Sequence, residues 1–130
     1  MDQYIDINVR PEGGNVYLSV IISGKEEWEF NYTTDYDSFI FFSEDAISGK
    51  IDLGKPKDII SSVHNSWARF ALLGGSNKTV SISMKWTQMV NGSEIVIYEH
   101  PPQNIELTDQ EPYQSLYSTI YFWRYSQPFA

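Results

Sequence analysis

The residues best suited to chemistry in this chain are the carboxylates and aromatic side chains of residues 23–45, a segment with seven acidic and seven aromatic residues. Carboxylates attract lysine and arginine, and tyrosine joins apolar area to a hydrogen-bonding tip. This combination suits a surface that recognises a basic protein. The candidate partner-binding residues are Glu26, Glu27, Glu29, Tyr32, Asp35, Tyr36, Asp37, Glu44 and Asp45. The alternative is an amphipathic hairpin whose aromatic side chains fill the core while its acids are only solvated.

No pattern typical of catalysis or metal binding accompanies these residues. His64 and His100 lie far apart in the sequence, with no third ligand nearby. Asp35 and Asp37 lack the glycine and ligand spacing of an EF-hand calcium loop. The chain has no cysteine, which excludes disulfides and thiolate chemistry. We therefore expect no cofactor, no metal ion and no enzymatic activity.

The net charge is −8, and the first 54 residues carry eleven acidic against three basic residues. Such a charge repels nucleic-acid phosphates and anionic lipids but attracts basic protein surfaces. The N-terminal sequence "MDQYIDINV" has no secretory-signal pattern, and no apolar run is long enough to span a membrane. We therefore expect a cytoplasmic protein with a protein partner and without a nucleic-acid or membrane partner. The oligomeric state stays open.

Strands are expected to position the acidic and aromatic residues. Residues 4–9 and 16–22 are rich in β-branched and aromatic residues and flank a turn with two glycines, which predicts a hairpin. In "EEWEFNY", residues 26–32, three aromatic side chains alternate with polar ones, the period of a half-buried strand. Residues 37–43 are more continuously apolar and predict a further, more buried strand.

A helix is expected in "KPKDIISSVHNSWARFALLGG", residues 55–75. Its apolar residues recur at helical spacing, Pro56 suits a first turn, and the Gly74-Gly75 pair suits a C-terminal cap. Trp67 falls on the apolar face of this helix. The tryptophans are expected to share an aromatic core built from Trp28, Trp67, Trp86 and Trp123.

A second hairpin is expected between residues 78–90 and 93–100. The Asn91-Gly92 pair between them predicts a tight turn, because both residues accept the positive φ that such a turn requires. The Pro101-Pro102 pair is expected to end this hairpin.

The last segment, residues 109–125, is ambiguous. Thr108 and Glu111 have the spacing of a helix capping box, which favours a helix, whereas the β-branched and aromatic content would equally suit a strand. No linker or repeat divides the chain. Residues 1–130 are accordingly expected to form a single α+β domain, a mostly antiparallel β-sheet with one or two helices.

The segment "NSWARFALLGGSNKTVSISM", Asn65 to Met84, resembles the helix-to-strand passage in immunity proteins of bacterial contact-dependent growth inhibition systems. Those proteins are small, cysteine-poor, often acidic cytoplasmic inhibitors that block a toxin domain by direct binding. The resemblance implies an antitoxin whose partner is a basic toxin domain, with a nuclease expected, but it carries over no partner-binding residue. The alternative function is a β-rich ligand-binding module that uses an aromatic sheet face.

Overall fold

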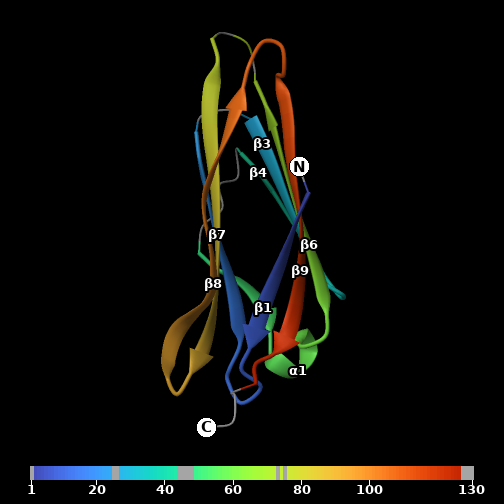
Figure 1. Cartoon of the computed structure of the whole chain (residues 1–130), viewed down its shortest axis with the longest axis vertical. Coiled ribbons are helices and arrows are strands. Elements are labelled where there is room, and N and C mark those ends of the chain that lie inside the picture. Colours follow the sequence, from blue (N-terminus) through green and yellow to red (C-terminus); the bar gives the residue numbers. More distant parts are fainter. Residues whose placement is uncertain (1, 25–26, 44–48, 73, 75, 127–130) are drawn as a thin grey trace.

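The computed structural model describes residues 2–24, 27–43, 49–72, 74 and 76–126. Within these residues, nine strands form two sheets that face each other along the long axis of the molecule, and one turn of helix lies at one end (Figure 1). Because successive side chains of a strand point to opposite faces, each sheet buries one face and presents the other outward.

The larger sheet, sheet A, has the strand order β1-β9-β6-β3-β4. Its strands are β1 (Asp2–Val9), β9 (Tyr113–Arg124), β6 (Val63–Ala71), β3 (Glu27–Thr33) and β4 (Ser38–Phe42). Neighbouring strands are antiparallel except β1 and β9, which run parallel. This order places β6 in the middle of the sheet.

The smaller sheet, sheet B, has the strand order β5-β2-β7-β8 and is antiparallel throughout. Its strands are β5 (Ile51–Gly54), β2 (Val16–Ser23), β7 (Lys78–Val90) and β8 (Ser93–Leu107). The expected mainly antiparallel β fold is therefore present in the described residues.

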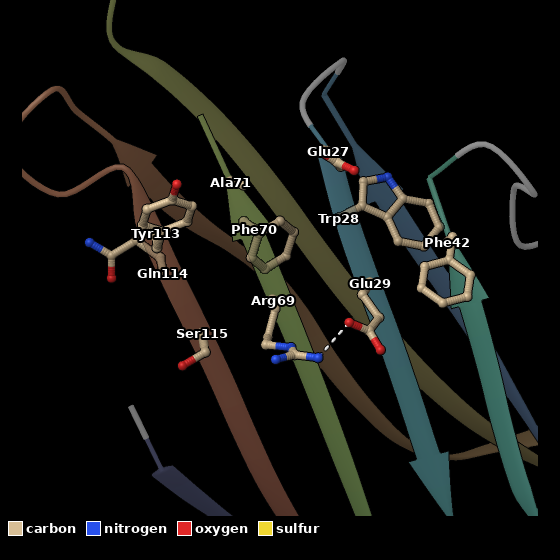
Figure 2. Close-up of a pocket in the computed structure, with 10 residues that line it drawn as sticks. All are labelled: Glu27, Trp28, Glu29, Phe42, Arg69, Phe70, Ala71, Tyr113, Gln114 and Ser115. Carbon is tan, nitrogen blue, oxygen red and sulfur yellow. Dashed lines mark hydrogen bonds and ion pairs between the residues drawn. The ribbon is translucent and has the colours of Figure 1, made fainter. Parts of the chain in front are cut away.

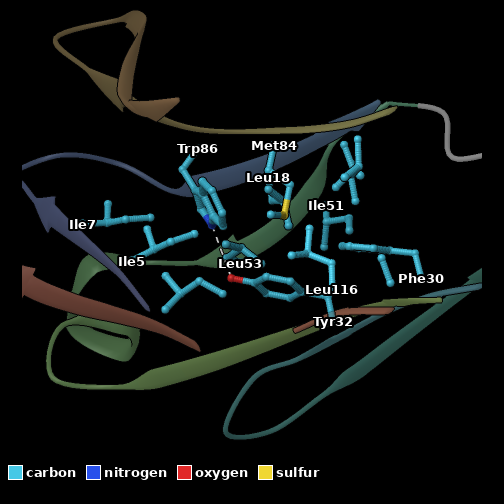
Figure 3. Packing of buried hydrophobic residues seen from close by; sticks show 14 of the residues in the cluster. Ile5, Ile7, Leu18, Phe30, Tyr32, Ile51, Leu53, Met84, Trp86 and Leu116 are labelled. Atoms are coloured by element: carbon cyan, nitrogen blue, oxygen red, sulfur yellow. Dashed lines mark hydrogen bonds between the residues drawn. The ribbon is translucent and has the colours of Figure 1, made fainter. Parts of the chain in front are cut away.

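The inward side chains of the two sheets meet in one apolar core (Figure 3). Leu18 and Trp86 from sheet B and Phe30 and Tyr32 from sheet A are completely buried there. Burying an apolar side chain of this size contributes about 1.5–3 kcal/mol, so aromatic residues on the inner faces strongly favour the pairing of the two sheets.

The prediction of a helix over residues 55–75 is wrong beyond the first turn of that segment. Helix α1 spans only Pro56–Ile59, and strand β6 follows it. The same residues also fit the two-residue repeat of a strand. Strand β6 buries every second side chain and pairs with both β3 and β9. Trp67 consequently projects outward, 39% exposed, and Trp123 is 51% exposed. The core contains Trp28 and Trp86 but not these two tryptophans.

The helix favoured for residues 109–125 is also wrong, because this segment forms β9. The backbone N–H of Glu111 donates to Oγ1 of Thr108 at 2.9 Å, and the Thr108 N–H donates to the Glu111 carbonyl at 3.2 Å. The spacing that resembles a capping box therefore closes the turn between β8 and β9, a role that threonine side chains also fill in turns.

The two expected hairpins differ in outcome. The Asn91-Gly92 turn joins β7 and β8 as predicted, with positive φ at both residues. The hairpin between residues 4–9 and 16–22 is wrong, because β1 pairs with β9 in sheet A while β2 lies in sheet B. The Pro101-Pro102 pair does not end β8, which continues to Leu107. Strand β8 is an edge strand, where a missing N–H costs no ladder hydrogen bond.

Candidate functional site

The structure places the candidate partner-binding residues in separate locations. Glu26, Glu44 and Asp45 lie outside the described residues. Glu27 and Glu29 project from the outer face of sheet A, on β3. Asp35, Tyr36 and Asp37 are exposed in the turn between β3 and β4.

The turn that carries Asp35, Tyr36 and Asp37 is organised by Thr34. The Thr34 hydroxyl accepts hydrogen bonds from the backbone N–H groups of Tyr36 at 3.2 Å and of Asp37 at 2.9 Å. Eight residues separate Asp35 from Glu27, which corresponds to about 26 Å of extended strand. The acids of the β3 strand and those of the turn therefore form two groups and not one continuous acidic face.

Tyr32 is the clear correction to the candidate set, because its side chain is completely buried. Its hydroxyl lies 2.8 Å from Nδ1 of His64 and accepts a hydrogen bond from Nε1 of Trp86 at 3.3 Å. An indole can only donate, so the phenol proton is available to Nδ1 of His64. Tyr32 joins the two sheets and has no surface to offer a partner.

Burial sets the protonation of this network. It raises the pKa of Tyr32, so the phenol stays neutral. Burial also lowers the pKa of His64 to about 4, against the opposing influence of the Asp35 charge. The imidazole is therefore neutral at pH 7 and accepts the Tyr32 proton at Nδ1.

The outer face of sheet A holds most of the exposed apolar surface of the described chain. Eleven large apolar side chains are exposed in total, and eight of them project from this face. They are Tyr4, Ile40, Phe42, Val63, Trp67, Tyr113, Tyr117 and Trp123. We call the outward side chains of sheet A the aromatic face. A contiguous exposed patch of this kind is typical of an interaction site.

The outer face of sheet B is different in composition. Its central strands present mostly serine, threonine and lysine, including Ser19, Ser83 and Lys85. Ile21 is an isolated exposed apolar residue among them. Since the same chain builds one polar and one aromatic outer face, the aromatic residues of sheet A are not explained by folding alone.

A row of stacked rings crosses from β9 to β1 on the aromatic face. The ring of Tyr121 lies 6.4 Å from those of both Tyr4 and Trp123, with interplanar angles of 23° and 22°. Nε1 of Trp123 donates to Oδ1 of Asp6 at 2.8 Å, which fixes the indole on the sheet. The row therefore presents a preorganised aromatic surface.

A second cluster on the aromatic face surrounds Arg69. Its Nη2 pairs with Oε2 of Glu29 at 2.6 Å, and its Cζ lies 4.3 Å from the centre of the Trp67 ring. Nδ2 of Asn31 donates to Oε1 of Glu29 at 3.1 Å. This hydrogen bond, together with the Arg69 charge, lowers the pKa of Glu29. Glu29 is therefore ionised and already paired within the face.

A hollow of about 480 Å³ lies beside this cluster, across the ends of β3, β6 and β9 (Figure 2). Phe42 lines one side of it and Tyr113 lines the other, and Glu29 and Arg69 of the cluster also belong to its lining. Ala71 lies between Glu27 and Tyr113 in the sheet register, and its methyl group leaves the space open.

The sequence contained a signal for the aromatic face that the helical interpretation obscured. In "YQSLYSTIYFWR", residues 113–124, outward aromatic residues occupy positions 113, 117, 121 and 123, while the alternate residues 116, 118, 120 and 122 are buried. This alternation is typical of a strand with one solvent-exposed face and one buried face. The outward position of Trp67 was harder to predict, because it follows only if the segment around Trp67 is a strand.

Comparisons of the chain with protein families, with curated proteins and with solved structures find no match. Among the described residues, no group of three or more histidine, aspartate or glutamate side chains is placed to hold a metal ion. The described residues also contain no helix with the length and apolar character needed to span a bilayer.

Proposed function

We propose that this protein is a non-catalytic inhibitor that neutralises a basic toxin domain by binding it through the aromatic face. The observation that carries the proposal is the concentration of exposed aromatic side chains on one outer sheet face while the other outer face is polar. Tyrosine and tryptophan are the side chains that most often dominate the free energy of protein–protein binding. The binding surface therefore differs from the acidic segment that the sequence suggests.

The charge of the aromatic face favours a basic partner. Asp2, Asp6, Glu27 and Glu29 supply four carboxylates on its outward positions. Arg69 is the cation that projects among them from the described strands, which leaves the face with a net charge of −3. A face of this sign speeds association with a basic surface and repels nucleic acid.

The size of the aromatic face suits a stable complex. Five strands spaced about 4.8 Å apart, with about nine residues in the central strand, give roughly 600–700 Å² of sheet surface. A standard protein–protein interface buries about 800 Å² on each partner. The face together with its rim, including Tyr36 and Asp37 in the neighbouring turn, is large enough for such an interface.

A second candidate function is a ligand-binding module that holds a sugar or another flat ligand on the row formed by Tyr4, Tyr121 and Trp123. The stacked geometry of that row is the observation in its favour. Aromatic rings present flat apolar faces to such ligands, and Asp6 adds a hydrogen-bonding group beside them. On this alternative, the Arg69 cluster and the hollow have no role.

Site-specific photo-crosslinking in cells tests the first proposal. A photoreactive residue at position 67 is expected to capture one basic protein, and the same residue at position 83, on the outer face of sheet B, is expected to capture none. The captured protein is then purified, and its toxic activity is measured with and without the inhibitor. Capture from position 83 alone, or a captured protein whose activity is unchanged by binding, would reject the proposal.

A further inference from the structure

A cleft lies where both sheets approach helix α1, apart from the hollow on the aromatic face. Its volume is about 570 Å³, within the range of about 300–1,000 Å³ that is typical of small-molecule sites. Sheet A contributes the turn between β3 and β4, and sheet B contributes the end of β5, which leads into α1. The charged side chains that line the cleft are Asp35, Asp37, Asp52, Lys55, Lys57 and Asp58. Four aspartates against two lysines give a net charge of −2, which favours a cationic ligand.

A buried hydrogen-bond donor also lines this cleft, the imidazole of His64, which is only 2% exposed. Its Nδ1 accepts the hydroxyl proton of Tyr32 at 2.8 Å, so the proton of the neutral ring is on Nε2. Among the described residues, Nε2 has no hydrogen-bond partner. A buried donor without a partner is unfavourable, so an oxygen atom of a ligand is stabilised at this point.

The core fixes the direction of this donor. Nε1 of Trp86 donates to the Tyr32 hydroxyl at 3.3 Å, and that hydroxyl donates in turn to His64 (Figure 3). The chain cannot reverse, because an indole only donates. Hydrogen bonds in such a chain polarise one another and strengthen the last donor. Nε2 of His64 is therefore a preorganised and uncharged donor.

The carboxylates of the β3–β4 turn supply acceptors in the same cleft. Asp35 and Asp37 are exposed, and among the described residues neither of them forms an ion pair. Asp52 differs, because its carboxylate accepts from Nδ2 of Asn15 at 3.1 Å and from the backbone N–H of Gly54 at 2.9 Å. The turn is therefore the part of the cleft that is best placed to pair with a cation.

Two simple classes of ligand fit this lining poorly. An anion would accept from His64 but would meet the carboxylates of four aspartates. An apolar amine would pair with the aspartates but would leave Nε2 of His64 without a partner. Hydroxyl groups suit the mixed lining, because each of them can both donate and accept.

We propose that the cleft binds a cationic polyol of the amino-sugar class. The ammonium group pairs with Asp35 and Asp37, and a hydroxyl oxygen accepts from Nε2 of His64. Tyr36 and Phe39, which also line the cleft, offer apolar area to the sugar ring. The site goes beyond the proposed function, since it takes a small molecule and does not use the aromatic face.

The test uses D-glucosamine in its protonated form and follows the imidazole nitrogens of His64 and the backbone N–H of Asp35 by two-dimensional NMR. Both sets of signals are expected to shift and saturate. N-acetyl-D-glucosamine keeps hydroxyl groups but has no charge, and cyclohexylamine keeps the charge but has no hydroxyl group. Each is expected to bind at least about threefold more weakly. Cyclohexylamine is also expected to leave the His64 signals in place.

Variants localise the binding. Asp35→Asn/Asp37→Asn removes two exposed charges and is expected to weaken glucosamine binding about threefold to tenfold. Glu99→Gln/Glu106→Gln removes the same charge from exposed positions of β8 and is expected to leave binding unchanged. Trp67→Ala on the aromatic face is also expected to bind glucosamine normally.

Three results would overturn the proposal: no saturable shift with glucosamine, an equal response to either comparison compound, or equal weakening by the turn and β8 variants. The outcome is separable from that of the proposed function. Glucosamine binding without any captured toxin would reject the inhibitor function alone, and a captured toxin without glucosamine binding would reject the amino-sugar site alone.

Discussion

The guanidinium of Arg69 lies 4.3 Å from the centre of the Trp67 ring, on the outward side of the central strand of sheet A. A core tryptophan could not accept this contact, because the charged partner would lose its hydration. The pair therefore shows that the outer side of β6 is exposed to solvent. Trp67 is accordingly available for binding.

Replacing Trp67 by alanine is expected to change the free energy of unfolding by less than about 1 kcal/mol, because the side chain is partly exposed and leaves no cavity. Trp86→Ala is the matched comparison. Trp86 is completely buried, and its truncation is expected to cost about 3–5 kcal/mol. Urea denaturation measures both values. A large loss for Trp67→Ala would show that its ring supports the core after all.

Tyr32→Phe tests the buried network. The substitution leaves Nε1 of Trp86 and Nδ1 of His64 without their partner in the core, so the free energy of unfolding should fall by about 1–3 kcal/mol. Tyr117→Phe removes a hydroxyl that bonds to Asn65 at an exposed site and should cost less than about 1 kcal/mol. Equal losses in thermal or urea denaturation would contradict the role given to Tyr32.

The neutral state of His64 predicts a pH dependence of stability. The folded protein holds the pKa of this residue at about 4, below its value of about 6.5 in the unfolded chain, so the unfolded state binds more protons as the pH falls. His64 should therefore lower the free energy of unfolding by about 2 kcal/mol between pH 7 and pH 5, and by about 3 kcal/mol by pH 4.

Substitution isolates this contribution of His64. The variant His64→Gln keeps a hydrogen-bonding group next to Tyr32 but does not titrate, so its stability should change less between pH 7 and pH 5 than that of the wild type. Denaturation of both proteins at each pH gives the comparison. Parallel pH profiles would mean that carboxylates account for the whole acid sensitivity.

The parts of the fold that follow from local chemistry could be predicted from the sequence. The Asn91-Gly92 turn forms because its backbone angles are a property of those two residues. The alternation around Trp28 and Phe30 predicts a half-buried strand, and both side chains lie in the core of the sandwich. These predictions required no knowledge of which strands pair.

The parts that depend on distant partners could not be predicted in the same way. Strand β9 comes from the last fifth of the sequence, and it forms between β1, from the first ten residues, and β6, from the middle of the sequence. Trp67 has helical spacing to its apolar neighbours and becomes an outward strand residue only because β3 and β9 flank β6. Tyr32 belongs to the acidic segment in sequence but points to the core. Tertiary pairing overrides local pattern at these positions.

The two acidic groups of residues 23–45 should differ in function. Reversing Glu27 and Glu29 to lysine is expected to slow association with the captured partner at least tenfold at low salt, because both carboxylates lie on the aromatic face. Reversing Asp35 and Asp37, in the turn at its rim, is expected to have a smaller effect. Stopped-flow kinetics at several salt concentrations measures both. A larger effect for the turn residues would move the interface to that end of the molecule.

The central claim is that the aromatic face binds the partner, and the dissociation constant of the purified complex tests it most directly. The variant Trp67→Ala/Tyr117→Ala truncates two neighbouring side chains on that face, and Ile21→Ala/Val96→Ala truncates two exposed apolar residues of sheet B. Calorimetry is expected to show binding weakened more than about 100-fold for the first variant and unchanged for the second. Wild-type affinity in the first variant, or a loss confined to the second, would contradict the account.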